Sequence, residues 1–223
     1  MGAVPWRSSR SVHYVSRDSH AGVDPKKRSL GAAERNETKR QTWHRIVRHI
    51  DANRLVFIDE SGANITLVPQ YGRAPRGERC PGRVPRNYGE NLTLLSSLTL
   101  DGISSAMILD GAVDARAFRL YIKRVLVPTL RPGQLVILDN LSVHKQEAVR
   151  HAIHAAGCRV LFLPPYSPDL TPIEQAFSKI KAYLRRVEAR TRVALEAALA
   201  VAIDLVTSAD AAGFFRHCGY EAR

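Results

Sequence analysis

Three carboxylates stand at the ends of apolar segments or at the start of a helix, where distant parts of a chain can meet. Asp59 follows residues 55–58, Asp139 follows residues 135–138, and Glu174 opens a helical pattern after a proline-rich turn. Carboxylates that converge repel one another and are costly to bury unless a cation neutralises them. Hard oxygen ligands of this kind suit Mg²⁺ or Mn²⁺. The trio therefore predicts a site for divalent metal ions.

The charge of the chain indicates what such a site would act on. The 223 residues include 33 Lys and Arg against 21 Asp and Glu, a formal net charge of +12, which favours a polyanionic partner such as nucleic acid. Two metal ions about 3.5 to 4 Å apart can activate water and stabilise the leaving oxygen of a phosphodiester. We therefore interpret the chain as a metal-dependent domain that cuts and joins DNA strands.

Each acid also has an explanation that needs no metal. An Asp at the end of a strand is often a turn or capping residue, and this applies to Asp59 and Asp139. Glu174 closes a T-x-x-E capping box that starts at Thr171, with Pro at the first helical position. Asp169 is a fourth acid of the same segment, and we expect it to organise the turn.

Basic and polar residues near the acids are candidate DNA contacts. Residues 71–87 form an expected loop whose guanidinium groups could bind phosphates, although a solvated surface loop would have the same composition. Asn140 and His144 could support the metal ligands or contact DNA, and Lys181 and Arg185 continue the helical stripe of Glu174 toward phosphates. The arginines of the loop are Arg73, Arg76, Arg79, Arg83 and Arg86.

The elements that must position these residues follow from hydrophobic periodicity. We expect strands at 55–58, 65–68, 91–100, 103–109, 135–138 and 159–163, and helices at 32–50, 115–130, 143–156 and from 173. Strands followed by strand-helix-strand alternation predict an α/β fold with a mixed sheet. We expect a disordered or weakly ordered basic arm over 1–30, an amphipathic linker helix over 31–50 and the catalytic domain over 51–223.

Several classes of protein are disfavoured. The three cysteines are widely spaced, which indicates neither a disulfide framework nor a zinc knuckle. No apolar stretch is long enough to span a membrane, and the first residues lack the apolar core of a secretory signal. Motifs for nucleotide cofactors and for serine hydrolases are also missing. We expect a cytoplasmic protein associated with the bacterial nucleoid.

At this point the sequence resembles a known family, the mariner-superfamily insertion-sequence transposases, and in particular their DDE endonuclease catalytic domain. The resemblance runs from about Pro25 to Tyr220, and 34 residues lie between Asp139 and Glu174, an interval typical of this superfamily. The segments that carry it are PKK at 25–27, LVFIDESG at 55–62, LDNLSVHK at 138–145, LPPYSPDLTPIE at 163–174 and FRHCGY at 215–220.

The resemblance implies an RNase H-like fold with a mixed five-stranded sheet flanked by helices. It also implies that Asp59, Asp139 and Glu174 bind two Mg²⁺ (or Mn²⁺) ions and act as the catalytic residues. Water would cut a phosphodiester at a transposon end, and the freed 3′-hydroxyl would attack target DNA, commonly at a TA dinucleotide. Both steps are in-line displacements at phosphorus, so one metal cluster can serve both.

One departure from the family leaves alternatives open. Family members carry helix-turn-helix modules ahead of the catalytic domain, and we find no such pattern before Asp59. We therefore expect a chain that lacks these modules, through truncation, a frameshift or a split gene. It could act as a homodimer, pair with a helix-turn-helix-bearing transposase product, or be a non-catalytic DNA-binding remnant. A further alternative is a stand-alone nuclease for RNA–DNA hybrids or junctions.

Overall fold

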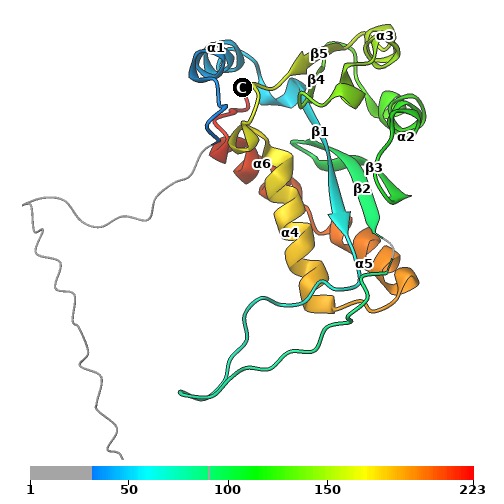
Figure 1. Ribbon diagram of the computed structural model, residues 1–223. Coiled ribbons are helices and arrows are strands. Elements are labelled where there is room, and N and C mark those ends of the chain that lie inside the picture. The colour runs from blue at the N-terminus through cyan, green and yellow to red at the C-terminus, as the bar shows by residue number, and fades with distance from the viewer. Residues whose placement is uncertain (1–31, 90) are drawn as a thin grey trace, which may run out of the picture. The chain divides into compact units, whose positions relative to one another are not determined.

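A five-stranded mixed sheet organises the part of the chain that the computed structural model describes, residues 32–89 and 91–223 (Figure 1). The strand order is β3-β2-β1-β4-β5, with antiparallel pairing of β1 to β2 and β2 to β3 and parallel pairing of β1 to β4 and β4 to β5. The predicted mixed sheet is confirmed. The strands are β1 (Leu55–Ala63), β2 (Leu92–Thr99), β3 (Gly102–Asp110), β4 (Leu135–Leu138) and β5 (Arg159–Phe162). The expected arm at 1–30 lies outside the described residues.

Helices cover both faces of this sheet. Alternate residues of β1 point to opposite sides, so Phe57 packs with α4 and α6 while Val56 and Ile58 pack with α2 and α3. The helices are α1 (Glu37–Val47), α2 (Ala115–Tyr121), α3 (Glu147–Ala155), α4 (Pro172–Val187), α5 (Arg192–Asp204) and α6 (Ser208–His217). A π-helical turn, η2 (Ile122–Leu126), continues α2, and a 3₁₀ turn, η4 (Ser142–Lys145), precedes α3.

Three local predictions are wrong. The first strand does not end at residue 58, since residues 59–63 extend β1 by pairing with β2, and residues 65–68 are not a strand but part of a loop. The Asn64 side chain instead accepts a hydrogen bond from the Thr66 N–H at 3.1 Å, which forms the turn. The helix expected from 143 begins only at Glu147, because the chain before it curls into η4.

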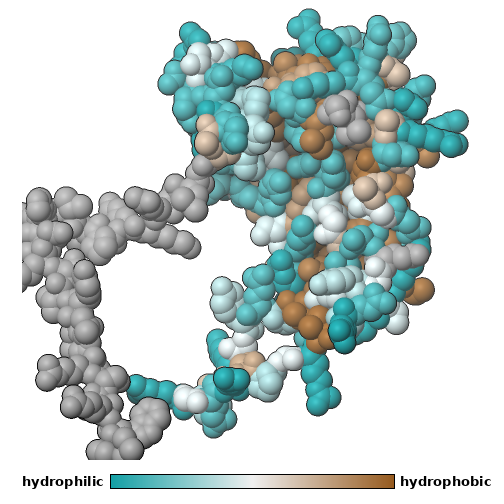
Figure 2. All heavy atoms as spheres, viewed as in Figure 1, coloured by the Kyte–Doolittle hydropathy of each residue, from teal (hydrophilic) through white to brown (hydrophobic). Residues whose placement is uncertain are grey.

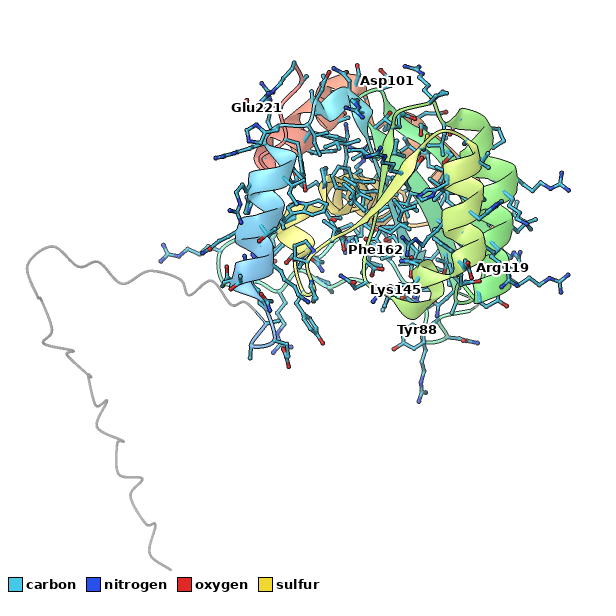
Figure 3. The ribbon with its side chains drawn as sticks, turned by 90° about the horizontal axis from the view of Figure 1, so that it is seen from above. Tyr88, Asp101, Arg119, Lys145, Phe162 and Glu221 are labelled. Atoms are coloured by element: carbon cyan, nitrogen blue, oxygen red, sulfur yellow. The ribbon has the colours of Figure 1, made fainter. Side chains whose placement is uncertain are left out.

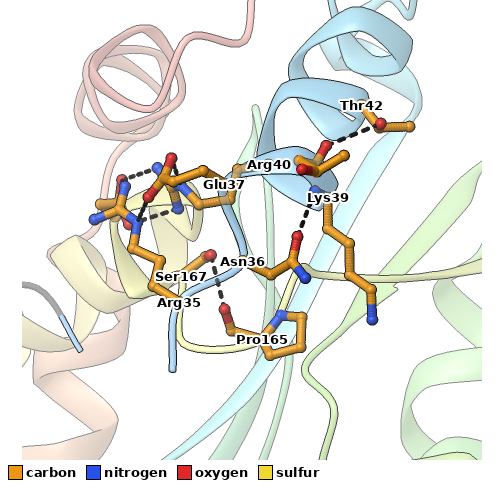
Figure 4. Close-up of polar contacts among 10 residues, drawn as sticks. Arg35, Asn36, Glu37, Lys39, Arg40, Thr42, Pro165 and Ser167 are labelled. Atoms are coloured by element: carbon orange, nitrogen blue, oxygen red, sulfur yellow. Dashed lines mark hydrogen bonds and ion pairs between the residues drawn. The ribbon is translucent and has the colours of Figure 1, made fainter. Parts of the chain in front are cut away.

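The amphipathic helix expected over 31–50 forms as α1, and it packs into the domain instead of standing apart as a linker. Trp43 is buried, and its indole N–H donates to the Tyr220 hydroxyl at 3.0 Å. That hydroxyl donates in turn to the Leu170 carbonyl at 2.7 Å. Arg40 of α1 makes two hydrogen bonds to Asp169, at 3.0 and 2.6 Å (Figure 4). Asp169 therefore fixes the proline-rich turn to α1.

No single helix within the described ranges is long and apolar enough to cross a membrane. One pair of helices in this part of the chain, α5 and α6, reaches the required length and composition together, and it is bent by 76°.

Replacement of Tyr220 by Phe tests the docking of α1. The change removes the hydroxyl and leaves the buried Trp43 N–H and Leu170 carbonyl without this partner, so we expect a loss of about 1 to 3 kcal/mol in the free energy of unfolding. Urea denaturation measures it. Tyr71→Phe, at a side chain that is 91% exposed, is the matched control and should change stability by less than about 0.5 kcal/mol. Equal stability of both variants would contradict the role given to Tyr220.

Candidate active site

The three acids singled out from the sequence line one cavity of about 460 Å³. They come from three elements: Asp59 from β1, Asp139 from the segment after β4, and Glu174 from the first turn of α4. The rest of the wall is formed by Asn140, Leu141, Leu163, Pro164, Pro165, Tyr166, Ser167, Pro168 and Thr171. The sequence therefore identified acids that the fold does bring to one place.

The sequence predicted that Asp59 directly follows the end of its strand. In the structure, Asp59 lies in the middle of β1. The parallel ladder with β4 stops at Phe57, whereas the antiparallel ladder with β2 continues to Ala63. Asp59 thus lies just beyond the end of the β1–β4 pairing, and its carboxylate accepts the Glu60 N–H at 2.9 Å. Burial, reinforced by the neighbouring carboxylates of Glu60, Glu174 and Asp139, raises the pKa of Asp59 to about 7.

Asp139 is held by a buried histidine. The Nδ1 atom of His144 lies 2.5 Å from Asp139 Oδ1, and its Nε2 atom lies 3.5 Å from Glu60 Oε2. The imidazole is fully buried and stacks on Phe118 of α2, with 4.3 Å between the ring centroids. The Leu141 N–H also donates to Asp139, at 2.9 Å. The carboxylate is therefore fixed in orientation by two donors.

These contacts set the charges of the pair. Burial acts to lower the pKa of His144, but the hydrogen bond to Asp139 and the negative charges of Asp139 and Glu60 outweigh it and raise the pKa to about 9. Burial acts to raise the pKa of Asp139, and the His144 and Leu141 hydrogen bonds outweigh it and lower the pKa. His144 is thus an imidazolium between two carboxylates at neutral pH.

We expected His144 either to contact DNA or to support a metal ligand. Its ring is fully buried and cannot touch DNA in this conformation. Its geometry fits the other expected role, support of a metal ligand. Asn140 lines the cavity, and its side-chain amide donates to the Leu163 carbonyl, which ties the ends of β4 and β5 together.

Glu174 faces the cavity without forming the capping box that its sequence allowed. The Thr171 side chain accepts no hydrogen bond from the start of α4, and its hydroxyl is a buried group without a partner among the described residues. The backbone closes the first turn instead, through the Glu174 N–H and the Thr171 carbonyl at 3.2 Å. The Glu174 carboxylate is left exposed at the cavity, so capping does not account for it.

The predicted basic residues are not gathered at the acids. Lys181 and Arg185 lie on α4, roughly 10 and 16 Å along the helix axis from Glu174 at 1.5 Å per residue. The five arginines of the 71–87 segment are exposed on a loop that extends away from the sheet (Figure 1) and is drawn mainly in hydrophilic and neutral colours (Figure 2). None of these seven residues lines the cavity of the acids.

The donor set fits hard divalent cations, although it is not gathered into a finished metal site. Within residues 32–89 and 91–223, no group of three or more His, Cys, Asp and Glu side chains is arranged to hold a metal ion. One oxygen of Asp59 and one of Asp139 accept hydrogen bonds from backbone N–H groups, those of Glu60 and Leu141. The raised pKa of Asp59 reflects its burial first and the nearby acids second.

Glu60 is a site residue to which the sequence did not point. Alternation along β1 sends it to the face opposite Asp59, and only the tertiary fold brings it to His144. Tyr166, by contrast, was recognisable as part of the proline-rich segment; it is 59% exposed at the cavity, with its backbone in the left-handed region (φ 53°).

Comparisons with known proteins agree with this fold. Three of the similar solved structures are those of Mos1 transposase: a paired-end complex with the left transposon end (TM-score 0.66, 19% identity), the strand transfer complex (0.69, 19%) and the catalytic domain with Raltegravir and Mg (0.57, 18%). These matches cover 88%, 88% and 85% of this chain and 63%, 62% and 90% of those chains.

The likeness establishes the RNase H-like architecture, and the chain spans less than two thirds of the length of the transposases in the first two complexes. A search of curated proteins found no significant match. The sequence matches the family described as DDE superfamily endonuclease over residues 54–196, more than half of the chain and a range that contains all three acids. The protein is a member of the DDE superfamily of endonucleases.

Proposed function

We propose that this protein is a transposase catalytic domain that cleaves DNA at transposon ends and transfers the freed strand into target DNA. The observation that carries the proposal is the convergence of Asp59, Asp139 and Glu174 on one cavity. Membership of the DDE endonucleases and the Mos1 fold support it. The activity, its DNA substrates and its metal dependence are all part of the proposal.

Asp59, Asp139 and Glu174 would hold two Mg²⁺ or Mn²⁺ ions. When bound, such ions supply activation of the attacking oxygen and neutralisation of charge at the phosphorus. The protein contributes the placement of the acids: Asp59 is enclosed on β1, Asp139 is oriented from β4, and Glu174 remains exposed to receive the ions and the DNA. Solved Mos1 structures that contain Mn or Mg are consistent with this assignment.

His144 would keep Asp139 in a productive orientation. Its Nδ1–H donates to Asp139 Oδ1, the oxygen that also accepts the Leu141 N–H, so the second oxygen takes no part in these contacts, and Glu60 balances the charge on the far side of the ring. Partners that orient a metal ligand in this way stabilise the ligand geometry before the metal binds. The phosphodiester would enter past the exposed side of the cavity, where Tyr166 and Glu174 lie.

The expected partners are the DNA of the transposon ends and of the target. Mos1 transposase has been solved in a complex with a transposon end, and we extend DNA binding to this chain because its net charge is +12. A homodimer, or association with a helix-turn-helix-bearing product, would supply recognition of the transposon end.

Loss of the second acid tests the proposed reaction. In the presence of Mn²⁺ the protein should nick supercoiled DNA, and Asp139→Asn should abolish the nicking because the neutral amide is a poor ligand for a hard cation. Gel electrophoresis of the relaxed product measures it. Asp101→Asn, at an acid whose side chain is 81% exposed, is the matched control and should retain activity. Undiminished nicking by Asp139→Asn would refute the proposal.

Replacement of Glu60 by Gln tests whether Glu60 helps His144 to hold Asp139 in position. Glu60→Gln keeps the shape of the side chain but removes the charge facing His144, so we expect the turnover number for nicking to fall about ten- to a hundredfold with little change in the KM for DNA. Glu147→Gln, at an exposed acid at the start of α3, serves as the control. The ¹⁵N shifts of the His144 ring should move in Glu60→Gln alone; unchanged shifts together with unchanged turnover would contradict the role.

The pH dependence of stability follows from the two raised pKa values. Asp59 keeps its proton in the folded state up to about pH 7, whereas the unfolded state loses it near the ordinary value of 3.8, so its contribution to stability falls between about pH 4 and 7. His144 contributes stability that is complete below 6.5 and is lost as the pH rises toward 9. The metal-free protein should therefore melt at a lower temperature at pH 9 than at pH 5.

The stabilisation by Mg²⁺ should increase with pH, whereas the stability of the metal-free protein should decrease. A metal that binds only the folded state stabilises it, and at Asp59 it must displace a proton below about pH 7. Thermal melts should therefore show a larger increase in Tm on adding Mg²⁺ at pH 8 than at pH 6. Asp59→Asn should show neither the increase nor its pH dependence, and an increase of the same size in that variant would argue against Asp59 as a ligand.

A further inference from the structure

The outward face of α2 and η2 carries a row of cations that the candidate site does not use. Arg116, Arg119 and Lys123 recur at helical spacing and are exposed, and Arg124 lies beside them. The opposite side of the same segment is apolar, with Phe118, Tyr121 and Ile122 buried under it. The row borders a surface hollow of about 450 Å³ lined by Asp114, Arg116, Ala117, Arg119, Leu120 and Lys123.

The charges of this face are not neutralised by the protein. Within the described ranges, Arg116, Lys123 and Arg124 have no ion-pair partner, and Arg119 donates to the uncharged Gln146 side chain at 2.7 Å. The one acid of the hollow, Asp114, caps α2 by accepting the Ala117 N–H at 2.7 Å. Four cations against one acid give this short segment a strongly positive surface.

The face is joined to the site of the acids by direct contacts. Arg119 bonds Gln146, which follows the exposed Lys145, and His144 of the same turn is bonded to Asp139. On the inner side, Phe118 of α2 stacks on the His144 ring. Seen from above, Arg119 and Lys145 lie along the same outer edge of the molecule (Figure 3). The α2 face is therefore connected to the Asp139 side of the cavity through the turn that carries Lys145.

We propose that this α2 face, defined by Arg116, Arg119, Lys123, Arg124 and Lys145, binds the sugar–phosphate backbone of duplex DNA that flanks the phosphodiester being cut. Arg116 and Lys123 are seven residues apart, about 10 Å along the helix, a distance over which one DNA strand carries roughly three phosphates. The contacts go to the backbone alone, so the face positions DNA without reading its sequence.

Charge complementarity selects DNA over another copy of the chain. Two copies that each carry a net charge of +12 repel one another through a face of this kind, whereas a polyanion releases its counterions on binding. The proposal rests on the proposed function, because it names a surface that guides DNA to that site. It differs from the sequence-based assignment of DNA contacts to the 71–87 arginines, and the two are separable by mutation.

Salt-dependent binding of a 30-base-pair duplex of arbitrary sequence tests the proposal. The double variant Arg116→Ala with Lys123→Ala leaves Arg119 and its bond to Gln146 in place. We expect the slope of log Kd against log salt concentration to fall by about two, since each lost phosphate contact contributes roughly 0.9. The matched control is Arg131→Ala with Arg159→Ala, which removes the same charge from the turn before β4 and from the start of β5, outside the α2 face. It should leave the slope close to that of the unmodified protein.

The outcomes separate this inference from the function on which it rests. If the unmodified protein binds and nicks DNA but the α2 double variant has the same salt slope as the control, the α2 face is not a DNA contact and the proposed function stands. If the unmodified protein neither binds nor nicks DNA, the proposed function itself fails. Thermal melts of both double variants exclude a loss of slope through unfolding.

Discussion

Three carboxylates from different elements line one cavity, and the structure must keep them close despite their mutual repulsion. The effect is seen at Asp59, whose pKa is raised to about 7 by burial and by three neighbouring acids. At Asp139 the opposite holds, because the His144 imidazolium and a backbone N–H stabilise the ionised form of the carboxylate. The fold leaves Glu174 open to solvent. Burial and nearby acids thus raise the pKa of Asp59, whereas the hydrogen bonds from His144 and Leu141 lower that of Asp139.

The division of the core into two clusters allows this arrangement. Asp59 and Glu60 are consecutive residues that point to opposite faces of β1, so one strand supplies an acid to the cavity and a second acid to the histidine behind Asp139. The Phe118 ring on α2 closes that histidine from the other side. Packing of α2 against the sheet is thus linked directly to the orientation of a candidate metal ligand.

The sequence predicted the fold class, the mixed sheet and the acids that line the cavity, because buried strands and the carboxylates beside them are local patterns. It failed where long-range pairing decided the outcome. The pairing of residues 61–63 with β2 carried β1 past Asp59, and the contact of His144 with Asp139 delayed the start of α3. It also left two explanations open for Glu174, and only the missing cap at Thr171 distinguished them. Glu60 had no local signal at all, since its partner His144 belongs to a different strand connection.

The alternation of Asp59 and Glu60 on β1 also determines where the chain tolerates insertions. One residue added within β1 before Asp59 would move both acids to the opposite faces and one position along the strand, so neither acid would keep its present partners. One residue added a little later, in the loop between β1 and β2, would alter neither, since that loop extends away from the sheet (Figure 1). Related chains should therefore vary freely in the length of this loop while keeping the spacing of β1 fixed.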